Sequence, residues 1–136
     1  MRILWPIAFI LPFAVQAQSI VALQAGYAKQ AVREDPAFKG FSAARGQRFF
    51  LSVHGKDWSC ASCHTSDPTH GGKHAVTGRA ILPMAPAANP ERFTDAAKTE
   101  KWFRRNCRDV VGRECSAREK GDVLAWLGSL RMGGVR

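Results

Sequence analysis

Apolar residues recur at helical spacing in several segments of the chain, and no segment alternates as a half-buried strand would. Residues 20–33 form the first predicted helix. The helix should end before Pro36, because proline breaks the interior of a helix. Ser42 is a favoured N-cap residue and opens a second predicted helix that runs to about residue 53. The pattern therefore predicts an all-α fold.

Two further helices are predicted in the C-terminal half of the chain. Residues 93–106 form the first of them, with Thr94 as its cap. Residues 116–132 begin with a capping box of the Ser-x-x-Glu type and end at glycines. Before these helices, residues 65–90 are rich in glycine and proline and predict a long loop. A loop of that length is unusual in a compact domain, but it can wrap the edge of a large, flat group.

The N-terminal segment has the pattern of a secretory signal. Arg2 precedes an almost wholly apolar run over residues 3–15, and Ala17 stands at a typical cleavage position. The apolar run is too short for a membrane anchor, because a helix needs about 20 residues to span a bilayer. We therefore expect residues 1–17 to be a cleaved signal peptide. Residues 18–136 should then be a single exported domain that keeps no contact with the membrane.

The composition adds a strongly basic balance. The 136 residues include 20 Lys and Arg against 11 Asp and Glu, for a formal net charge of +9. Such a charge suits nucleic acid, an anionic membrane surface or an acidic protein partner. Export excludes nucleic acid as the expected partner. An acidic redox partner and a basic surface without a partner both remain open.

Cys60, Cys63 and His64 form a Cys-x-x-Cys-His run. Two thiols one helical turn apart can add to the two vinyl groups of a porphyrin, and the next residue can offer its imidazole to the iron. The run is the motif of c-type haem attachment. A zinc site would need two further ligands at compact spacing, and a thioredoxin-like site would need a βαβ setting. Because bacteria attach this haem outside the cytoplasm, we expect a periplasmic protein with one covalent haem c, bound by Cys60 and Cys63, and with His64 as the proximal iron ligand.

Two cysteines remain, Cys107 and Cys115. Cysteines of an exported protein normally pair in the oxidising compartment that they reach. We therefore expect a disulfide between Cys107 and Cys115.

Residues 41–130 resemble the class I cytochromes c. The run GQRFF at 46–50 resembles their N-terminal helix, in which a glycine lets a second helix cross closely, and LAWL at 124–127 resembles the C-terminal helix that crosses it. Residues 72–78 resemble the loop after the attachment motif. The resemblance implies a small helical bundle around one haem. The candidates to neutralise the haem propionates are Lys73, Arg79 and Arg92.

The sixth iron position separates an electron carrier from a gas-binding protein. Met84, in the run LPMAP, is the usual kind of ligand in an electron carrier. It follows His64 unusually early in the chain, however, and a methionine there can instead pack at the haem edge. The remaining histidines are expected at the surface or the propionate edge: they are His54, His70 and His74.

Asn106 is the other candidate for the sixth position. It shares one helix face with Trp102 and Phe103, and this aromatic face should point inward. A buried amide on that face needs a partner, which an iron ion could provide. The alternative is that Asn106 is a helix C-cap, a common role of asparagine.

Three runs of the C-terminal half resemble the SHP-type cytochromes, which are oxygen-binding class I cytochromes c with an asparagine sixth ligand, related to cytochrome c″. The runs are residues 86–95, 100–107 and 112–117. The resemblance implies that Asn106 is the distal ligand, where the cytochrome c″ relatives have histidine, and that Cys107–Cys115 is the disulfide of the family. It also implies a redox partner that is itself a multihaem cytochrome c.

An amide oxygen is a hard, weak ligand that suits Fe(III) better than Fe(II). We therefore expect reduction to release Asn106 and to open the iron to a diatomic gas such as O2 or NO. The expected function is electron transfer coupled to gas binding, without enzymatic activity. The alternatives are a simple electron shuttle with His64 and Met84 as ligands, and a peroxidase-like enzyme. The enzyme would need a distal acid–base pair, for which only Arg105 or Arg108 stands near Asn106.

Overall fold

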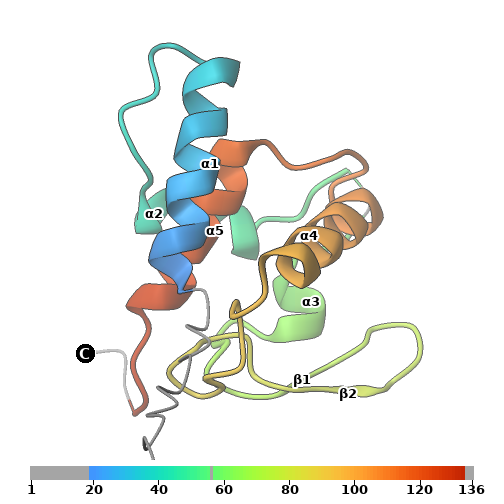
Figure 1. Ribbon diagram of the computed structural model, residues 1–136. Helices are drawn as coiled ribbons and strands as arrows, with labels where there is room; N and C mark the ends of the chain where they lie inside the picture. Colours follow the sequence, from blue (N-terminus) through green and yellow to red (C-terminus); the bar gives the residue numbers. More distant parts are fainter. Residues whose placement is uncertain (1–18, 56, 134–136) are drawn as a thin grey trace, which may run out of the picture.

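The computed structural model describes residues 19–55 and 57–133 (Figure 1). The helices of this part of the chain are α1 (Ile20–Glu34), α2 (Ala43–Leu51), α3 (Ala61–His64), α4 (Ala96–Val110) and α5 (Ala117–Ser129). Its strands are β1 (Gly72–Lys73) and β2 (Ala80–Ile81). None of these helices has the length and apolar character needed to cross a membrane. The predicted signal peptide lies outside the described residues.

Side-chain caps begin the four long helices, and those at Ser42 and Ser116 were predicted from the sequence. Ser19 and Ser42 each accept a hydrogen bond from the third residue of the helix that follows, and Ser116 forms a full capping box with Glu119. The cap of α4 is Asp95 and not the predicted Thr94.

The error at α4 has a local cause. Phe93 adopts a left-handed backbone conformation with φ of 62°, which is unusual for a bulky residue. The Thr94 hydroxyl donates to the carbonyl of Glu91 at 3.0 Å, so Thr94 belongs to the turn before the helix. The helix consequently starts later than predicted and also extends further, to Val110, so that Asn106 lies inside it. The alternative role of Asn106 as a C-cap is therefore wrong.

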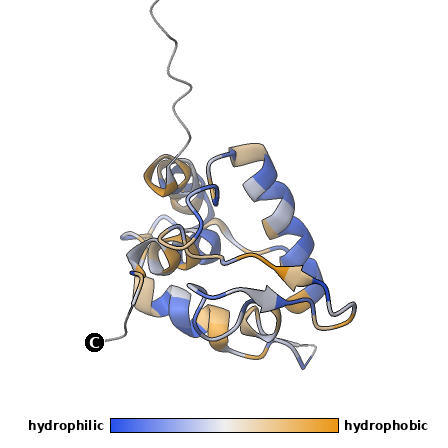
Figure 2. Cartoon of the chain, turned by 90° about the horizontal axis from the view of Figure 1, so that it is seen from below, coloured by the Kyte–Doolittle hydropathy of each residue, from blue (hydrophilic) through white to orange (hydrophobic). Residues whose placement is uncertain are grey.

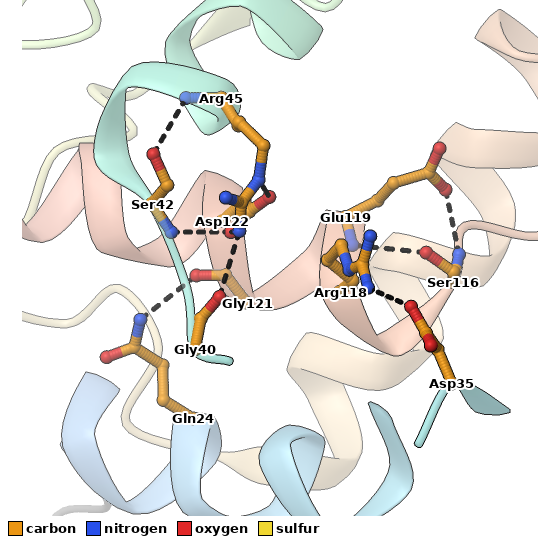
Figure 3. Close-up of polar contacts among 10 residues, drawn as sticks. All are labelled: Gln24, Asp35, Gly40, Ser42, Arg45, Ser116, Arg118, Glu119, Gly121 and Asp122. Carbon is orange, nitrogen blue, oxygen red and sulfur yellow. Dashed lines mark hydrogen bonds and ion pairs between the residues drawn. The ribbon is translucent and has the colours of Figure 1, made fainter. Parts of the chain in front are cut away.

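Helix α5 is the central element, and α1 and α2 both pack against it (Figure 1). The crossing of α2 and α5 depends on Gly46, where an added Cβ would lie 1.9 Å from the carbonyl oxygen of Asp122. The predicted close approach at this glycine is confirmed. The same crossing holds the buried Asp122 carboxylate, which accepts from the Ser42 backbone N–H at 2.6 Å and from Arg45 Nε at 2.7 Å (Figure 3).

Two apolar clusters meet along α5. The first contains Leu23 and Tyr27 of α1 with Leu124, and the second contains Phe50 of α2 with Trp126. Full burial of such a side chain stabilises the fold by about 1.5–3 kcal/mol. Hydrophilic residues predominate on α4 (Figure 2), and only Thr99 and Cys107 of this helix are buried. Helix α4 therefore buries less of its surface against the rest of the fold than α5 does.

The long loop contains a short antiparallel ladder, which corrects the prediction that the chain has no strand. Gly72 pairs with Ile81 and Lys73 pairs with Ala80. An added Cβ at Gly72 would lie 1.9 Å from the carbonyl oxygen of Cys63, so the ladder lies directly against α3. With this addition the predicted all-α class is confirmed.

Candidate haem site

The Cys-x-x-Cys-His run forms a single helical turn. Cys60 stands at the start of α3 with helical φ and ψ, and its carbonyl oxygen accepts hydrogen bonds from the N–H of Cys63 at 3.3 Å and of His64 at 3.0 Å. Cys60 and Cys63 are half-buried free thiols in the structure. The turn therefore presents both thiols within one helical repeat and the imidazole next to them, as the motif requires.

Burial raises the pKa of the Cys60 thiol to about 11. A thiol in this state is neutral at physiological pH. Among residues 19–55 and 57–133 no three His, Cys, Asp or Glu side chains gather into a metal-binding group. The two thiols and the imidazole of this turn are the side chains that a covalently attached haem needs from this side.

His64 has the state that an iron ligand needs. Burial lowers its pKa to about 4, with a smaller contribution from the Arg92 cation, so the imidazole is neutral and keeps a lone pair. Its ring packs against Phe50, with 6.2 Å between ring centroids. The Nδ1 atom is buried and has no hydrogen-bond partner in the described part of the chain. A buried polar atom without a partner costs about 1–3 kcal/mol, so this pocket is incomplete as polypeptide alone.

Asn106 lies on α4, half-buried, in the turn after Trp102 and Phe103. Phe103 packs against both apolar clusters, including the one that Cys60 and Ala61 contact, so the attachment turn and α4 border a common core. Within the described ranges the Asn106 amide makes no side-chain hydrogen bond, and Trp102 on the same face is 45% exposed. On this face of α4 the Asn106 amide therefore lacks a hydrogen-bond partner, and the Trp102 ring is only partly covered by other residues.

The Cys107–Cys115 disulfide is present in the structure, with 5.7 Å between the Cα atoms and both cysteines buried. It ties the last turn of α4 to the residue that precedes the Ser116 cap of α5. Asn106 consequently lies directly beside a covalent cross-link.

Met84 lies in a loop that is held by backbone hydrogen bonds. Its N–H donates to the carbonyl of Pro68 at 3.0 Å, and Pro68 is fully buried in the segment that leaves His64. Arg92 Nε donates to the carbonyl of Pro83 at 2.8 Å on the other side of Met84. The Met84 side chain packs against the cluster around Phe50. Met84 thus packs at the edge of the second apolar cluster.

The other histidines use their ring nitrogens elsewhere. The Nε2 atom of His54 is 2.8 Å from the carbonyl oxygen of Phe49, and the exposed His70 pairs with Asp67. His74 Nδ1 accepts from backbone N–H groups of the hairpin turn. His70 and His74 are exposed, as expected, whereas His54 is half-buried with its ring against Phe49. Of the three propionate candidates, Lys73 and Arg79 are exposed, whereas Arg92 is half-buried.

Sequence patterns did not reveal two groups around this site. One is the anchoring of the Met84 loop by Arg92, because an isolated arginine carries no motif. The other is a network of Tyr27, Glu100 and Lys120 that joins α1, α4 and α5. Its members are far apart in the sequence. The only signal available was Lys120, a lysine of the last helix that is buried in the structure.

Comparison with solved structures defines the class of protein. The fold matches the structure of oxidised SHP, described as an oxygen-binding cytochrome c, with a TM-score of 0.73 and 42% identity over 83% of this chain and 98% of that one. It also matches oxidised cytochrome c″ from Methylophilus methylotrophus, with a TM-score of 0.74 and 38% identity over 81% and 93% of the two chains. The protein is a c-type cytochrome with one covalent haem c.

Sequence relatives place it more narrowly. The chain is 51% identical over 89 residues to the cytochrome c-type protein SHP of Cereibacter sphaeroides, which covers 62% of this chain and 68% of that protein. It is 40% identical over 105 residues to cytochrome c″ of Methylophilus methylotrophus, covering 74% and 73%. A family model described as a domain of unknown function (DUF1924) matches residues 36–127. The chain belongs to the family of SHP and cytochrome c″.

Proposed function

We propose that this protein is a periplasmic cytochrome that couples electron transfer to the binding of a diatomic gas, O2 or NO, and that it is not an enzyme. In this proposal Cys60 and Cys63 carry the haem, His64 is the proximal ligand and Asn106 is the distal ligand of the ferric iron. The observation that carries it is the half-buried Asn106 amide, which has no partner among the described side chains, on the aromatic face of a helix cross-linked at the next residue.

A bound haem supplies an iron that changes between the ferric and ferrous states and accepts one ligand beyond His64. The neutral imidazole of His64 holds the proximal position in either state. The Asn106 amide oxygen would be a weak ligand, held by ferric iron better than by the softer ferrous iron. The amide NH2 group is then free to donate a hydrogen bond to a gas molecule in the position that the oxygen has left.

Two relatives support this sequence of events. SHP is described as an oxygen-binding cytochrome c. The solution structure of cytochrome c″ is described as giving insight into the structural basis of haem-ligand detachment, and it matches this chain with a TM-score of 0.73 and 36% identity. A distal ligand that detaches is therefore a reasonable property to propose for Asn106.

The alternative is an electron shuttle with His64 and Met84 as permanent ligands. Against it stand the backbone hydrogen bonds from Met84 and Ala85 to Pro68, at 3.0 Å each, which hold the methionine loop to the segment leaving His64. The packing of Met84 against the Phe50 cluster also occupies its side chain.

Substitution of the two candidate ligands tests the proposal. We expect Asn106→Ala to convert the ferric haem from low spin to high spin, as seen in its absorption spectrum, because no other side chain replaces the amide. Met84→Ala, the matched control, should leave the spectrum unchanged. Asn106→His should give a low-spin haem, as expected of a stronger ligand. A high-spin Met84→Ala variant together with an unchanged Asn106→Ala spectrum would show that the protein is an electron shuttle.

The outer face of α4 suggests how a redox partner docks. Five exposed cations lie on this helix: Lys98, Lys101, Arg104, Arg105 and Arg108. At helical spacing Lys101, Arg104 and Arg108 lie opposite Asn106, whereas Arg105 stacks over the Trp102 ring at 5.6 Å. Arg105 and Arg108 have acidic partners, but the other three form no ion pair in the described part of the chain. A cationic surface of this kind steers an acidic protein, and the proposed partner is an acidic multihaem cytochrome c.

The place of action follows from the N-terminal segment. Residues 1–17 are proposed to be a signal peptide that is removed after Ala17, which leaves residues 18–136 as the periplasmic cytochrome domain. The segment itself lies outside the described residues. Its basic start and short apolar run are the support for this proposal.

A further inference from the structure

Tyr27, Glu100 and Lys120 meet where α1, α4 and α5 come together. The Tyr27 hydroxyl donates to Glu100 Oε2 at 2.8 Å, and Lys120 Nζ donates to Glu100 Oε1 at 2.6 Å. The ammonium group also lies 5.4 Å from the centre of the Tyr27 ring, within cation–π distance. Lys120 is only 5% exposed and Tyr27 only 8%. Burial and the hydrogen bond to Glu100 raise the pKa of Tyr27 well above its usual range, so it remains a neutral donor.

A buried ammonium group is an unusual way to stabilise a helix interface. Removing it from water is costly, and an apolar side chain of similar volume at Lys120 could stabilise the fold as well or better. What an apolar contact lacks is direction, whereas the hydrogen bonds to the two oxygens of Glu100, a side chain that is 40% exposed, favour one placement of α4. The network therefore determines the position of this helix more than it adds net stability.

Helix α4 has few other means of positioning. Helices α1 and α2 pack closely on α5, whereas in residues 19–55 and 57–133 α4 has no comparable interface with another helix. Its apolar contacts are made by Ala96, which packs against the cluster of Leu23 and Tyr27, and by Phe103. Phe103 packs edge to face against Tyr27, with 6.1 Å between ring centroids, and also contacts the cluster of Phe50. Beyond this, α4 is attached at Glu100 through the network and at Cys107 through the disulfide. Asn106 lies between these two attachments, directly before Cys107.

We propose that the Tyr27–Glu100–Lys120 network fixes the tilt of α4 and thereby sets the strength of the bond between Asn106 and the haem iron. The inference rests on the proposed distal role of Asn106. The network and the disulfide are the directional attachments of the helix, whereas the apolar contacts of Ala96 and Phe103 allow it to tilt more easily. A pivot at Cys107 turns the Asn106 side chain, and a weak amide ligand tolerates little loss of alignment. Tyr27, Glu100 and Lys120 are thus positioning residues, which act on the iron through Asn106.

Imidazole is a suitable probe, because it competes with Asn106 for the ferric iron of the intact holoprotein. We expect Lys120→Met, which keeps the length of the side chain and removes its charge, to raise the affinity for imidazole by about threefold or more. Lys120→Arg should restore most of the original affinity. The matched control is Arg118→Met, also on α5, because Arg118 pairs with Asp35 beyond the end of α1 and forms no bond with α4 (Figure 3). It should leave the imidazole affinity unchanged even if the melting temperature falls.

Combination with Asn106→Ala separates the two proposals. If the network acts through Asn106, Lys120→Met has no further effect on imidazole affinity in the Asn106→Ala protein. If Asn106→Ala raises the affinity and Lys120→Met alone does not, the positioning role is wrong while the distal role of Asn106 stands. An equal effect of Lys120→Met in both backgrounds would also overturn the positioning role. If Asn106→Ala itself changes neither spectrum nor affinity, the proposed ligation is wrong.

Tyr27→Phe provides a milder test if Lys120→Met fails to fold. It removes only the hydroxyl that binds Glu100 and keeps the ring against Phe103 and Lys120. We expect a smaller rise in imidazole affinity, in the same direction, that disappears in the Asn106→Ala background. An affinity equal to that of the unmodified protein would overturn the proposal.

Discussion

Gly46 determines how closely α2 and α5 can approach each other. The carbonyl oxygen of Asp122 occupies the place where a Cβ would lie, at 1.9 Å, and backbone atoms at both ends of this contact leave no room to move. The crossing in turn places Phe50, which is 1% exposed, against Trp126 and the His64 ring. The absence of a side chain at Gly46 thus permits the helix crossing that places Phe50 against the proposed proximal ligand.

Gly46→Ala should therefore destabilise the protein. The added methyl group cannot be placed without separating the two helices, and overpacking of this kind costs about 2–3 kcal/mol. Urea unfolding of the holoprotein measures the loss. Gly26→Ala on α1 is the control, since nothing lies within 4 Å of its Cβ position, and it should stabilise the helix by up to about 1 kcal/mol. Equal free energies of unfolding for the two variants would contradict this view of the crossing.

Single residues also show how far local patterns are predictive. The capping box at Ser116 and the glycine at 46 could be predicted, because each depends on neighbours in sequence or on a well-defined motif. The start of α4 could not, because it depends on the positive φ of Phe93, and apolar packing against two clusters favours that conformation over the local preference. The start of α4 is therefore determined by tertiary contacts that the local sequence pattern does not specify.

Among the elements, α4 combines a hydrophilic surface with the proposed distal ligand. Its last turn is held by the disulfide from Cys107 to Cys115, and its middle by the bonds of Glu100. An element with little apolar burial of its own depends on such specific attachments for its place in the fold.

Removal of the disulfide should have two separable effects. In the variant with Cys107→Ser and Cys115→Ser, we expect the free energy of unfolding to fall by about 2.5 kcal/mol, because the short loop is no longer closed in the unfolded chain. We also expect the ferric haem to bind imidazole more tightly, because α4 loses one of its attachments. Denaturant unfolding and an imidazole titration measure the two quantities. Loss of stability with unchanged imidazole affinity would show that the disulfide does not position Asn106.

The long helices could be predicted from sequence, whereas the contacts that arrange them could not. Helical spacing and caps are local, and they located α1, α2 and α5 to within a few residues. The ladder of β1 and β2, and the bonds from Met84 and Ala85 to Pro68, join backbone atoms that carry no side-chain signal. The Tyr27–Glu100–Lys120 network likewise joins three helices whose relative placement no motif specifies.

At the scale of the whole molecule, more than half of the 11 acidic residues form ion pairs with Arg or Lys in the described part of the chain. Six of them pair with Arg or Lys side chains: Asp35, Glu100, Asp109, Glu114, Glu119 and Asp122. The net charge of +9 is therefore expressed at the surface, where unpaired cations such as Lys101 and Arg104 of α4 project. The rate of encounter with an anionic partner should then depend on where the cations lie on the surface as well as on the net charge.

Oxidation of the reduced protein by ferricyanide, a small trianion, tests this prediction. The rate should fall as ionic strength rises, since salt screens the attraction. Replacing Lys101 and Arg104 by glutamate should slow the reaction several-fold at low salt and flatten its salt dependence. Replacing Lys29 and Arg33, exposed on α1, by glutamate changes the net charge equally and should have a clearly smaller effect. If both double variants respond alike, the overall charge steers the encounter and α4 is no preferred docking face.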